Sequence, residues 1–343
     1  METTNLLLRS TRVTRTGMIN PTFIEDAVIV SEKEQEKEHP NFIESNTSGI
    51  TLEELETNCI VPSFGDNQLT ISHQTFIHRI EEAASMFFAG ETFGNTEIRV
   101  SHKILGRHPS ALTKRKEELK PEDETIYYQR MAFCFHIRTI CREMNGEEVH
   151  LCIGGVRSLN EENLYGKKSP EKFKIFIGWR VRVCSNLMLT CDGLTGRLEV
   201  MGDTDIYIAA LKLFREFNPE QNLRLLENLG RTIISQEQFC QIIGRLRLYL
   251  VLPASQMKEL PKVILGDSNI NAATKGYIDN PNFGLRGRAK ISCWDLMQLL
   301  NEAAKQSYID KFLERNQNAT DFAVGIQKAL RGEDTENYGW FLR

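Results

Sequence analysis

Long apolar runs and export signals are both missing from this sequence. No window approaches about 18 consecutive uncharged apolar residues, the length that spans a bilayer. Residues 1–20 lack the apolar core and the small-residue cleavage site of a signal peptide. We therefore expect a cytoplasmic protein without a membrane partner. Its 8 cysteines lie at irregular spacings in apolar stretches, which is typical of reduced core thiols and not of a disulfide framework.

The short motifs that mark common enzyme classes are missing as well. The sequence contains no glycine-rich phosphate loop, no paired-histidine zinc motif, no serine nucleophile elbow and no Cys-x-x-Cys pair. These absences argue against an ordinary ATPase, dehydrogenase, α/β-hydrolase or zinc peptidase. The sequence therefore favours a protein that is not an enzyme, although catalytic groups assembled from distant positions would escape such a search.

The charge is nearly balanced over the whole chain but unevenly distributed along it. Apolar residues make up 41% and charged residues 26% of the 343 positions, which is typical of a globular protein. A net charge of −4 argues against a protein that coats duplex nucleic acid. Residues 1–60 contain 5 Lys/Arg and 11 Asp/Glu, whereas residues 97–186 contain 17 and 12. The middle of the chain is therefore its basic part.

The order of the hydrophobic patterns predicts an α+β fold. Residues 1–64 are acidic with little apolar periodicity, so we expect a largely disordered or irregular tail there. Helical spacing begins at Ser72, and alternation with a period of two follows between residues 96 and 188, interrupted by a charged helical segment at about 109–120. We expect a mainly antiparallel sheet domain at 65–200 and a mainly helical domain at 201–343 that packs on the sheet.

Capping residues mark where five of the helices should start and end. A side-chain oxygen before an apolar-periodic run satisfies the free amides of the first turn, and glycine is favoured just past the last turn. The expected start and end signals are Ser72 with Gly90, Asn218 with Gly230, capping boxes at Ser235/Gln238 and Ser292/Asp295, and Thr320 with Gly332.

Four soft metal ligands flank a turn signal at Asn145 and Gly146. If paired positions sum to an even number, strand alternation puts all four on one face and the neighbouring apolar residues on the other. An Asn-Gly two-residue turn gives an odd sum, so plain cross-strand packing of these side chains is the alternative. No cofactor is predicted apart from zinc at this set, which comprises Cys134, His136, His150 and Cys152. Asp203 and Asp205 form a weaker candidate for a hard cation, and the alternative is that Asp203 or Thr204 caps a helix.

A basic and aromatic group of residues points to nucleic acid. On the strand at 179–183, Arg180 and Arg182 share the face opposite Trp179, and we expect that face to be exposed and cationic. Cations for phosphates and rings for bases are what single-stranded DNA or RNA binding uses. The alternative is that the arginines pair with nearby glutamates. The candidate nucleic-acid-binding residues are Lys103, Arg107, Lys114, Arg115, Lys116, Arg138, Arg180 and Arg182.

A series of short segments in a fixed order carries a family resemblance. They read ISHQTF (71–76), VSHKILGR (100–107), GGV (154–156), NLY (163–165), FIGW (176–179), VCSN (183–186), IGR (243–245), YIDN (277–280), SYID (307–310) and WFL (340–342). The series resembles an uncharacterised family of Bacteroidetes proteins, domain of unknown function 3871, over roughly residues 65–343. The portion around 183–186 is also similar to phage/plasmid-like proteins.

The resemblance implies a context and no chemistry, because no activity, cofactor or catalytic residue comes with it. Proteins of this kind associate with integrated or conjugative elements, which favours a role in DNA metabolism, transfer or defence evasion. We therefore expect a mobile-element accessory protein that binds nucleic acid through the basic sheet face. Two alternatives stay open: a protein-interaction or anti-host regulatory factor with a host or element-encoded protein partner, and a metal-dependent enzyme. The sequence does not give the oligomeric state.

Overall fold

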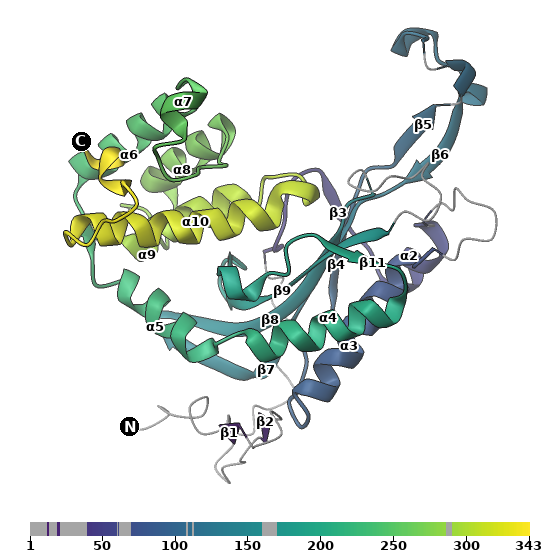
Figure 1. The fold of residues 1–343 in the computed structure, drawn as a ribbon, viewed down its shortest axis with the longest axis horizontal. Coiled ribbons are helices and arrows are strands. Elements are labelled where there is room, and N and C mark those ends of the chain that lie inside the picture. Colours follow the sequence, from purple (N-terminus) through teal and green to yellow (C-terminus); the bar gives the residue numbers. More distant parts are fainter. Residues whose placement is uncertain are drawn as a thin grey trace.

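The computed structural model describes residues 12–13, 19–20, 40–59, 61, 70–107, 109–111, 113–159, 170–285 and 290–343. Its centre is a curved antiparallel sheet (Figure 1) with the strand order β10–β9–β8–β7–β4–β3, to which β11 adds beside β9. The strands are β3 (Thr47–Gly49), β4 (Glu97–Ser101), β7 (Met131–Met144), β8 (Glu147–Arg157), β9 (Glu171–Val181), β10 (Leu187–Met188) and β11 (Leu198–Val200). The predicted α+β class, with the sheet first and the helices second, is confirmed.

The β7–β8 hairpin has an odd pairing register next to its turn and an even register farther along the strands. Asn145 and Gly146 have φ values of 50° and 85°, as a type I′ turn requires, and Met144 pairs with Glu147 in the odd register. Between His136 and Cys141 the register shifts, and beyond the shift the pairing becomes even. This irregularity lets a two-residue turn coexist with an apolar face that is continuous along both strands.

One face of the sheet is covered by α2 (Leu52–Asn58), α3 (His73–Phe87) and α4 (Asp203–Glu216). The Ser72 hydroxyl caps α3 by accepting from the Thr75 amide at 3.0 Å, as expected. The ring of Phe76 lies 5.3 Å from that of Phe133 and 4.6 Å from that of Phe173, which anchors the helix on the sheet. Burial of each such side chain contributes roughly 1.5–3 kcal/mol.

The opposite face of the sheet is covered as well, by helices of the C-terminal region. Helices α9 (Cys293–Ala304) and α10 (Ile309–Leu330) lie beside it, and a second apolar cluster fills the space between the sheet and the start of α10. That cluster comprises Phe42, Ile43, Ala132, Cys134, Cys152, Val156, Phe176, Leu187, Leu189, Ile309, Phe312 and Leu313. The sheet is therefore an inner layer over much of its area.

The C-terminal helices follow the capping signals closely, with one exception. The remaining helices are α5 (Pro219–Leu229), α6 (Gln236–Tyr249), α7 (Ala254–Met257) and α8 (Asp267–Asp279), and the caps predicted at Asn218, Ser235 and Ser292 are confirmed. The last long helix, α10, begins at Ile309, so the start expected at Thr320 is wrong. Thr320 is buried inside the helix because the apolar stripe begins about two turns earlier, with Phe312 and Leu313.

A two-stranded ribbon projects from the sheet, away from the helices (Figure 1). It consists of β5 (Ile104–Arg107) and β6 (Glu124–Tyr128), which pair antiparallel. The helix expected at about 109–120 is wrong, because this segment forms the 3₁₀ turns Pro109–Ala111 and Lys116–Glu118, with a further turn at Pro121–Asp123. Every residue between Leu112 and Leu119 is polar or charged, so a continuous helix there would have no apolar face to bury.

Part of the acidic N-terminal segment is ordered and contributes to the fold. Residues 40–59 supply β3 and α2, and the side chains of Phe42 and Ile43 are fully buried. Apart from the short strands β1 (Arg12–Val13) and β2 (Ile19–Asn20), residues 1–39 lie outside the described part. The division into domains at 64 and 200 stays a prediction. None of the described helices offers an apolar stretch of the length that a bilayer requires.

Candidate nucleic-acid interface

Five of the eight candidate nucleic-acid residues lie on the β5–β6 ribbon or at its root. Lys103 occupies the short link between β4 and β5, and Arg107 is the last residue of β5. Lys114, Arg115 and Lys116 follow near the tip. The ribbon carries these residues away from the body of the protein (Figure 1).

Two of these cations stabilise the ribbon itself. The Lys114 ammonium lies 2.8 Å from both carboxylate oxygens of Asp123, and the Arg107 guanidinium donates to the Lys114 carbonyl at 2.8 Å. The Lys114 hydrogen bond, followed by one from the Lys120 amide, lowers the pKa of Asp123 below its ordinary value. Asp123 therefore stays charged, and Lys114 is neutralised within the tip.

The other three basic residues on the ribbon or at its root face solvent. Lys103, Arg115 and Lys116 are exposed, and within the part of the chain that the structure describes none of them takes part in an ion pair. Glu118 accepts from the backbone amide of Arg115 at 3.0 Å, so this contact does not use the guanidinium group. We name Lys103, Arg115 and Lys116 the ribbon cations. They are the candidate residues that remain available to phosphate.

The expectation that Arg180 lies on an exposed cationic face is wrong. Strand alternation does place it opposite Trp179, but its side chain is only 11% exposed. Its guanidinium donates to the Glu97 carboxylate and to the Ser185 hydroxyl at 2.8 Å each, and it lies 5.9 Å from the Phe42 ring. The reason is that residues 40–44 and the helices beyond them cover this face.

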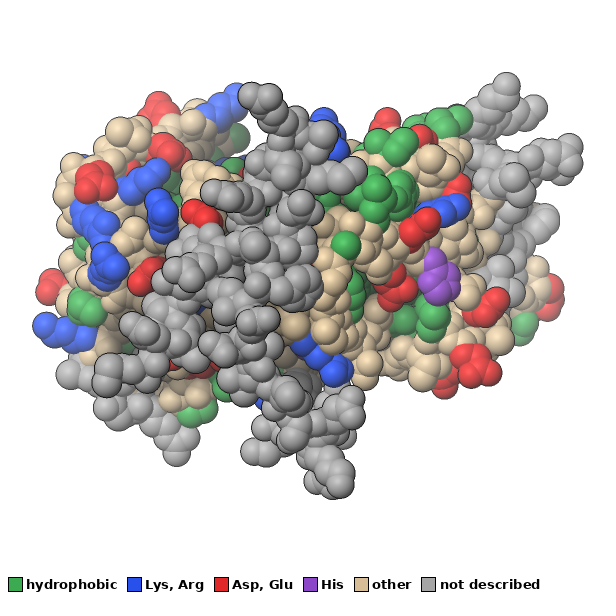
Figure 2. Space-filling model, turned by 90° about the horizontal axis from the view of Figure 1, so that it is seen from below, with side chains coloured by type: hydrophobic (Ala, Val, Ile, Leu, Met, Phe, Trp, Pro, Cys, Tyr) green, Lys and Arg blue, Asp and Glu red, His purple; other side chains and the backbone are tan. Residues whose placement is uncertain are grey.

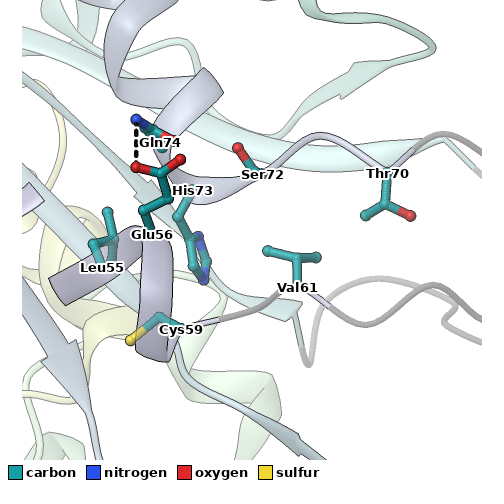
Figure 3. A pocket seen from close by; sticks show the side chains of 8 residues that line it. All are labelled: Leu55, Glu56, Cys59, Val61, Thr70, Ser72, His73 and Gln74. Atoms are coloured by element: carbon teal, nitrogen blue, oxygen red, sulfur yellow. Dashed lines mark hydrogen bonds between the residues drawn. The ribbon is translucent and has the colours of Figure 1, made fainter. Parts of the chain in front are cut away.

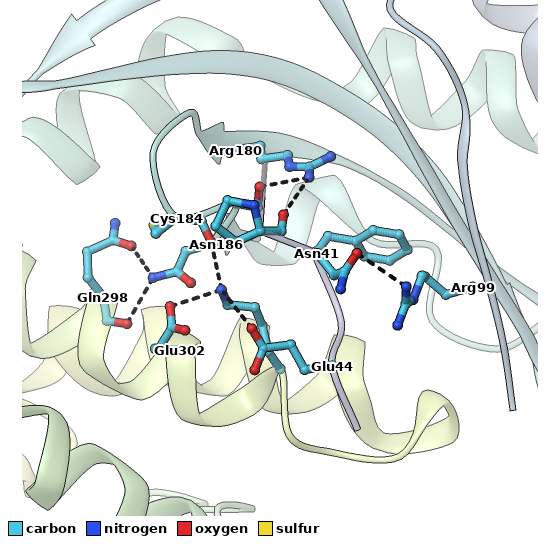
Figure 4. A network of polar contacts seen from close by, with 12 residues as sticks. Asn41, Glu44, Arg99, Arg180, Cys184, Asn186, Gln298 and Glu302 are labelled. Carbon is cyan, nitrogen blue, oxygen red and sulfur yellow. Dashed lines mark hydrogen bonds and ion pairs between the residues drawn. The ribbon is translucent and has the colours of Figure 1, made fainter. Parts of the chain in front are cut away.

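Arg180 belongs to a buried polar junction between the sheet and the helical region (Figure 4). Lys305, 1% exposed, donates to the Cys184 carbonyl at 2.6 Å and pairs with Glu302 at 2.9 Å. The Asn186 amide donates to the Gln298 side chain at 3.0 Å. We name Arg180 and Lys305, with these partners, the junction. Its charges hold elements together and are not presented to a ligand.

The two remaining candidates are separate from the ribbon. Arg182 follows β9, is 43% exposed and pairs with Glu148 at 2.8 Å, so here the glutamate pairing that the sequence left open is what the structure shows. Arg138 is exposed on the irregular part of β7, where its amide donates to the Thr92 carbonyl at 2.7 Å. The eight candidates therefore do not form one continuous surface.

The four soft ligands share one face of the β7–β8 hairpin, as the even register requires, but they separate into two pairs. The Cys134 and Cys152 thiols contact each other, and burial, followed by that contact, raises the pKa of Cys152 well above its ordinary value. The His136 and His150 rings lie 5.4 Å apart, and His150 contacts Glu148 at 2.9 Å. No three His, Cys, Asp or Glu residues in the described ranges are grouped to hold a metal ion. Zinc at this set stays a prediction.

The acidic pair at the start of α4 acts in the fold. Asp203 binds the Arg79 guanidinium at 2.7 Å, and this hydrogen bond lowers the pKa of its carboxyl. Asp205 accepts from the Met201 amide at 2.9 Å and from the Gly202 amide at 3.2 Å. Gly202 is the N-cap residue of α4, so the cap expected at Asp203 or Thr204 is wrong. Asp205 satisfies the amides before the first turn, and Asp203 links α3 to α4.

A pocket between α2 and α3 was not predicted from the sequence (Figure 3). It has a volume of about 150 Å³, and Leu55, Cys59, Val61 and His73 are among the residues that line it. One signal could have pointed to His73: it lies at helical spacing with Phe76, Ile77 and Ile80, which puts it on the buried stripe of α3. An ionisable ring on such a stripe is buried with the core.

Another face of the molecule shows no continuous basic surface. Figure 2 views the protein from below the orientation of Figure 1, and basic, acidic and apolar side chains are interspersed over the described residues visible there. A binding surface for phosphates needs several cations without interleaved carboxylates. This view therefore offers no rival to the ribbon.

Comparison with known proteins gives a family match. A family described as "Domain of unknown function, B. Theta Gene description (DUF3871)" matches residues 23–342. No curated protein and no solved structure matches the chain. The match begins before residue 40, so it includes the ordered segment 40–59 that packs on the sheet.

Proposed function

The chain belongs to the DUF3871 family. From this premise we propose that it is a cytoplasmic accessory protein that binds nucleic acid through the β5–β6 ribbon and prefers single strands to duplexes. The mobile-element setting implied by the resemblance is part of the proposal. A partner encoded by the host or by the element is compatible with it. The proposal moves the contact surface from the sheet face, which is covered, to the ribbon.

One observation carries the proposal: three cations without an ion pair in the described part of the chain lie along an element that projects from the body. Phosphate contacts supply most of the affinity of non-specific nucleic-acid binding, and each one releases counterions. A projecting two-stranded ribbon can approach a polynucleotide without a clash from the rest of the fold. Tyr128, at the end of β6 and opposite Ile104, supplies an aromatic ring near the root.

The test is a titration of a labelled single strand of about 16 nucleotides, repeated from low to moderate salt. We expect affinity that falls as salt rises. Replacing the three ribbon cations by alanine should lower the slope of log K against log salt by about 2, because each single-strand phosphate contact contributes about 0.7. A duplex of the same sequence shows whether single strands are preferred.

A matched control removes the same charge elsewhere. Lys212, Arg224 and Arg231 are 73%, 76% and 68% exposed, and each pairs with a glutamate four residues earlier or later in the chain. Their triple alanine variant should bind as the wild type does. Absence of affinity at low salt, or a ribbon variant that matches this control, would overturn the proposal.

The protein-interaction alternative has a specific observation in its favour. Leu248, Leu250 and Val251, which lie at the C-terminal end of α6, have 43%, 37% and 76% of their surface exposed. Exposed apolar side chains in a row often mark a contact surface. Self-association that rises with concentration and is lost on Val251→Lys, together with indifference to oligonucleotides, would favour this alternative.

A further inference from the structure

Helix α6 contains a glycine that the packing of its own chain does not require. Three glycines lie inside the described helices, at positions 244, 276 and 325. A side chain at Gly276 would press on Leu299. One at Gly325 would clash with the ring of Tyr338, so both glycines permit close packing within the chain. At Gly244 a side chain would meet no atom of any other element within 4 Å in the described part of the chain. Because glycine weakens a helix relative to alanine, its use here points to a close approach from outside.

Gly244 lies in the middle of the exposed face of α6. The buried residues of this helix are Phe239, Ile242, Ile243, Leu246 and Tyr249. On the opposite side, exposed residues recur at spacings of three and four, which keeps them on one side of a helix. They are Glu237, Cys240, Gly244, Arg247 and, just past the end of the helix, Val251. We name these five residues the α6 face.

The α6 face presents apolar surface to solvent. Val251 is 76% exposed, and Leu248 beside it is 43% exposed. Cys240, one turn before the glycine, is a free and exposed thiol. Figure 1 shows α6 in the helical region, at the end of the molecule opposite the ribbon. Exposed apolar surface next to a helix backbone that can be approached closely is suited to packing against another helix.

The two charges of the α6 face are complementary to each other in an antiparallel pair. If two copies of α6 pair with Cys240 of one opposite Gly244 of the other, the residue three positions before Cys240 faces the residue three positions after Gly244. These residues are Glu237 and Arg247, and by symmetry the pair forms twice. In a parallel pair each charge would face its own copy. Glu237 takes part in no ion pair within the described ranges, and Arg247 lies 3.8 Å from Asp267 with 51% of its side chain exposed.

We propose that the α6 face binds a second copy of this chain, as an antiparallel helix pair related by a two-fold axis. Gly244 lets the two backbones approach, and the pairs between Glu237 and Arg247 set the direction. A single helix pair is a small interface, so the dissociation constant should lie in about the micromolar range. The proposal does not rest on nucleic-acid binding, because the ribbon lies at the other end of the molecule and the test uses no oligonucleotide.

The test is sedimentation of the full chain from about 1 to 500 µM, where we expect the average mass to rise from one chain towards two. Glu237→Arg and Arg247→Glu should each weaken association about tenfold or more, because like charges then face each other across the axis. An equimolar mixture of these two variants should associate as the wild type does, since every facing pair again has opposite charges. Only a contact between the two positions on different copies gives this rescue.

Variants of Gly244 separate association from folding. Gly244→Ala should resist urea better than the wild type, because alanine favours the helix, yet associate more weakly. Gly244→Leu should abolish association by holding the helices apart. Lys212→Glu, at a position 73% exposed on α4, is the control for a charge reversal elsewhere and should associate as the wild type does. A wild type that stays a single chain at the highest concentration overturns the proposal in favour of a foreign partner. A mixture of the two charge variants that does not associate overturns it as well, as does wild-type association of Gly244→Leu.

Discussion

The junction and the ribbon carry the same kinds of residue in opposite physical states. Arg180 and Lys305 in the junction are 11% and 1% exposed, and each contacts a carboxylate within 3 Å. Lys103, Arg115 and Lys116 on the ribbon are exposed and take part in no ion pair within the described ranges. The residue type therefore says little about the role of a cation in this protein. What covers the side chain decides whether its charge supports the fold or meets a ligand.

The difference is also energetic. Removing one partner of a buried ion pair leaves an uncompensated charge and destabilises a protein by about 3–5 kcal/mol. Removing an exposed cation changes stability by about 0.5 kcal/mol or less, but under the proposed function it removes a phosphate contact. Variants in the junction should therefore change unfolding, and variants in the ribbon should change binding. Each of the following predictions tests that separation.

The largest expected effect is at Arg180. Arg180→Met should lower the free energy of unfolding by about 3 kcal/mol, because it strands Glu97, which is 26% exposed, beside the covered face. Urea denaturation followed by circular dichroism measures this change. Affinity for a labelled strand should stay within twofold of the wild type in the remaining folded protein.

The double variant Arg180→Met with Glu97→Leu serves as the control for this prediction. It removes both charges of the pair, so it should be more stable than the single variant. If Arg180→Met alone left unfolding unchanged while weakening binding of the strand, the assignment of Arg180 to the junction would be wrong.

The local features around the junction could be predicted from the sequence. Alternation correctly placed Arg180 opposite Trp179, and the Asn145 and Gly146 turn and the caps at Ser72 and Ser235 are local signals that the structure confirms. The cover over Arg180 comes from Phe42, which is distant in sequence and lies in an acidic segment without periodicity. Contacts of that kind depend on tertiary packing, which no local pattern encodes.

For the candidate site, too, the sequence indicated the residue types but not their contacts. The sequence identified the cations of the ribbon, but it could not distinguish Lys114, neutralised by Asp123, from its neighbours Arg115 and Lys116. His73 was inferable only as a buried ring, because its hydrogen bond depends on the position of the Gln129 carbonyl. Proximity in space and hydrogen-bond direction were the missing information in both cases.

The second prediction extends the comparison to His73, a buried residue whose ring is neutral in the folded protein. Burial, and then the positive charge of Arg157, lower the pKa of His73 from 6.5 to about 3 in the folded protein. Below pH 6.5 the His73 ring is therefore protonated in the unfolded chain but not in the folded chain. The contribution of His73 to the free energy of unfolding is fully present above pH 6.5 and is lost as the pH falls towards 3. The loss from this residue should be about 1.4 kcal/mol per pH unit. Urea unfolding of the wild type and His73→Phe at neutral pH and near pH 5 isolates it.

His78, on the same helix, provides the matched control. Its side chain is 52% exposed, so His78→Phe should retain the pH dependence of the wild type. His73→Phe should instead lose the part of the acid destabilisation that this ring causes. Equal pH dependence in the two variants would mean that the buried ring accepts a proton in the folded state.

The third prediction concerns one charge of the ribbon. Lys116→Ala should lower affinity for a labelled single strand several-fold at low salt and reduce the salt slope by about 0.7, because one phosphate contact is lost. Its unfolding should not change, since Lys116 is exposed and takes part in no ion pair in the described part of the chain. Lys212→Ala, at a position 73% exposed on α4, is the control and should alter neither quantity.

The smallest expected effect is at Arg182, two residues from Arg180 along the chain. Arg182 and Glu148 are 43% and 41% exposed, so solvent screens their 2.8 Å contact. Arg182→Met should therefore change the free energy of unfolding by less than about 1 kcal/mol, measured as for Arg180→Met. The same substitution at two positions so near in sequence then differs only in what covers the side chain. If Arg182→Met lowered the free energy of unfolding as much as Arg180→Met does, burial of the side chain would not explain why the junction differs from the other cations.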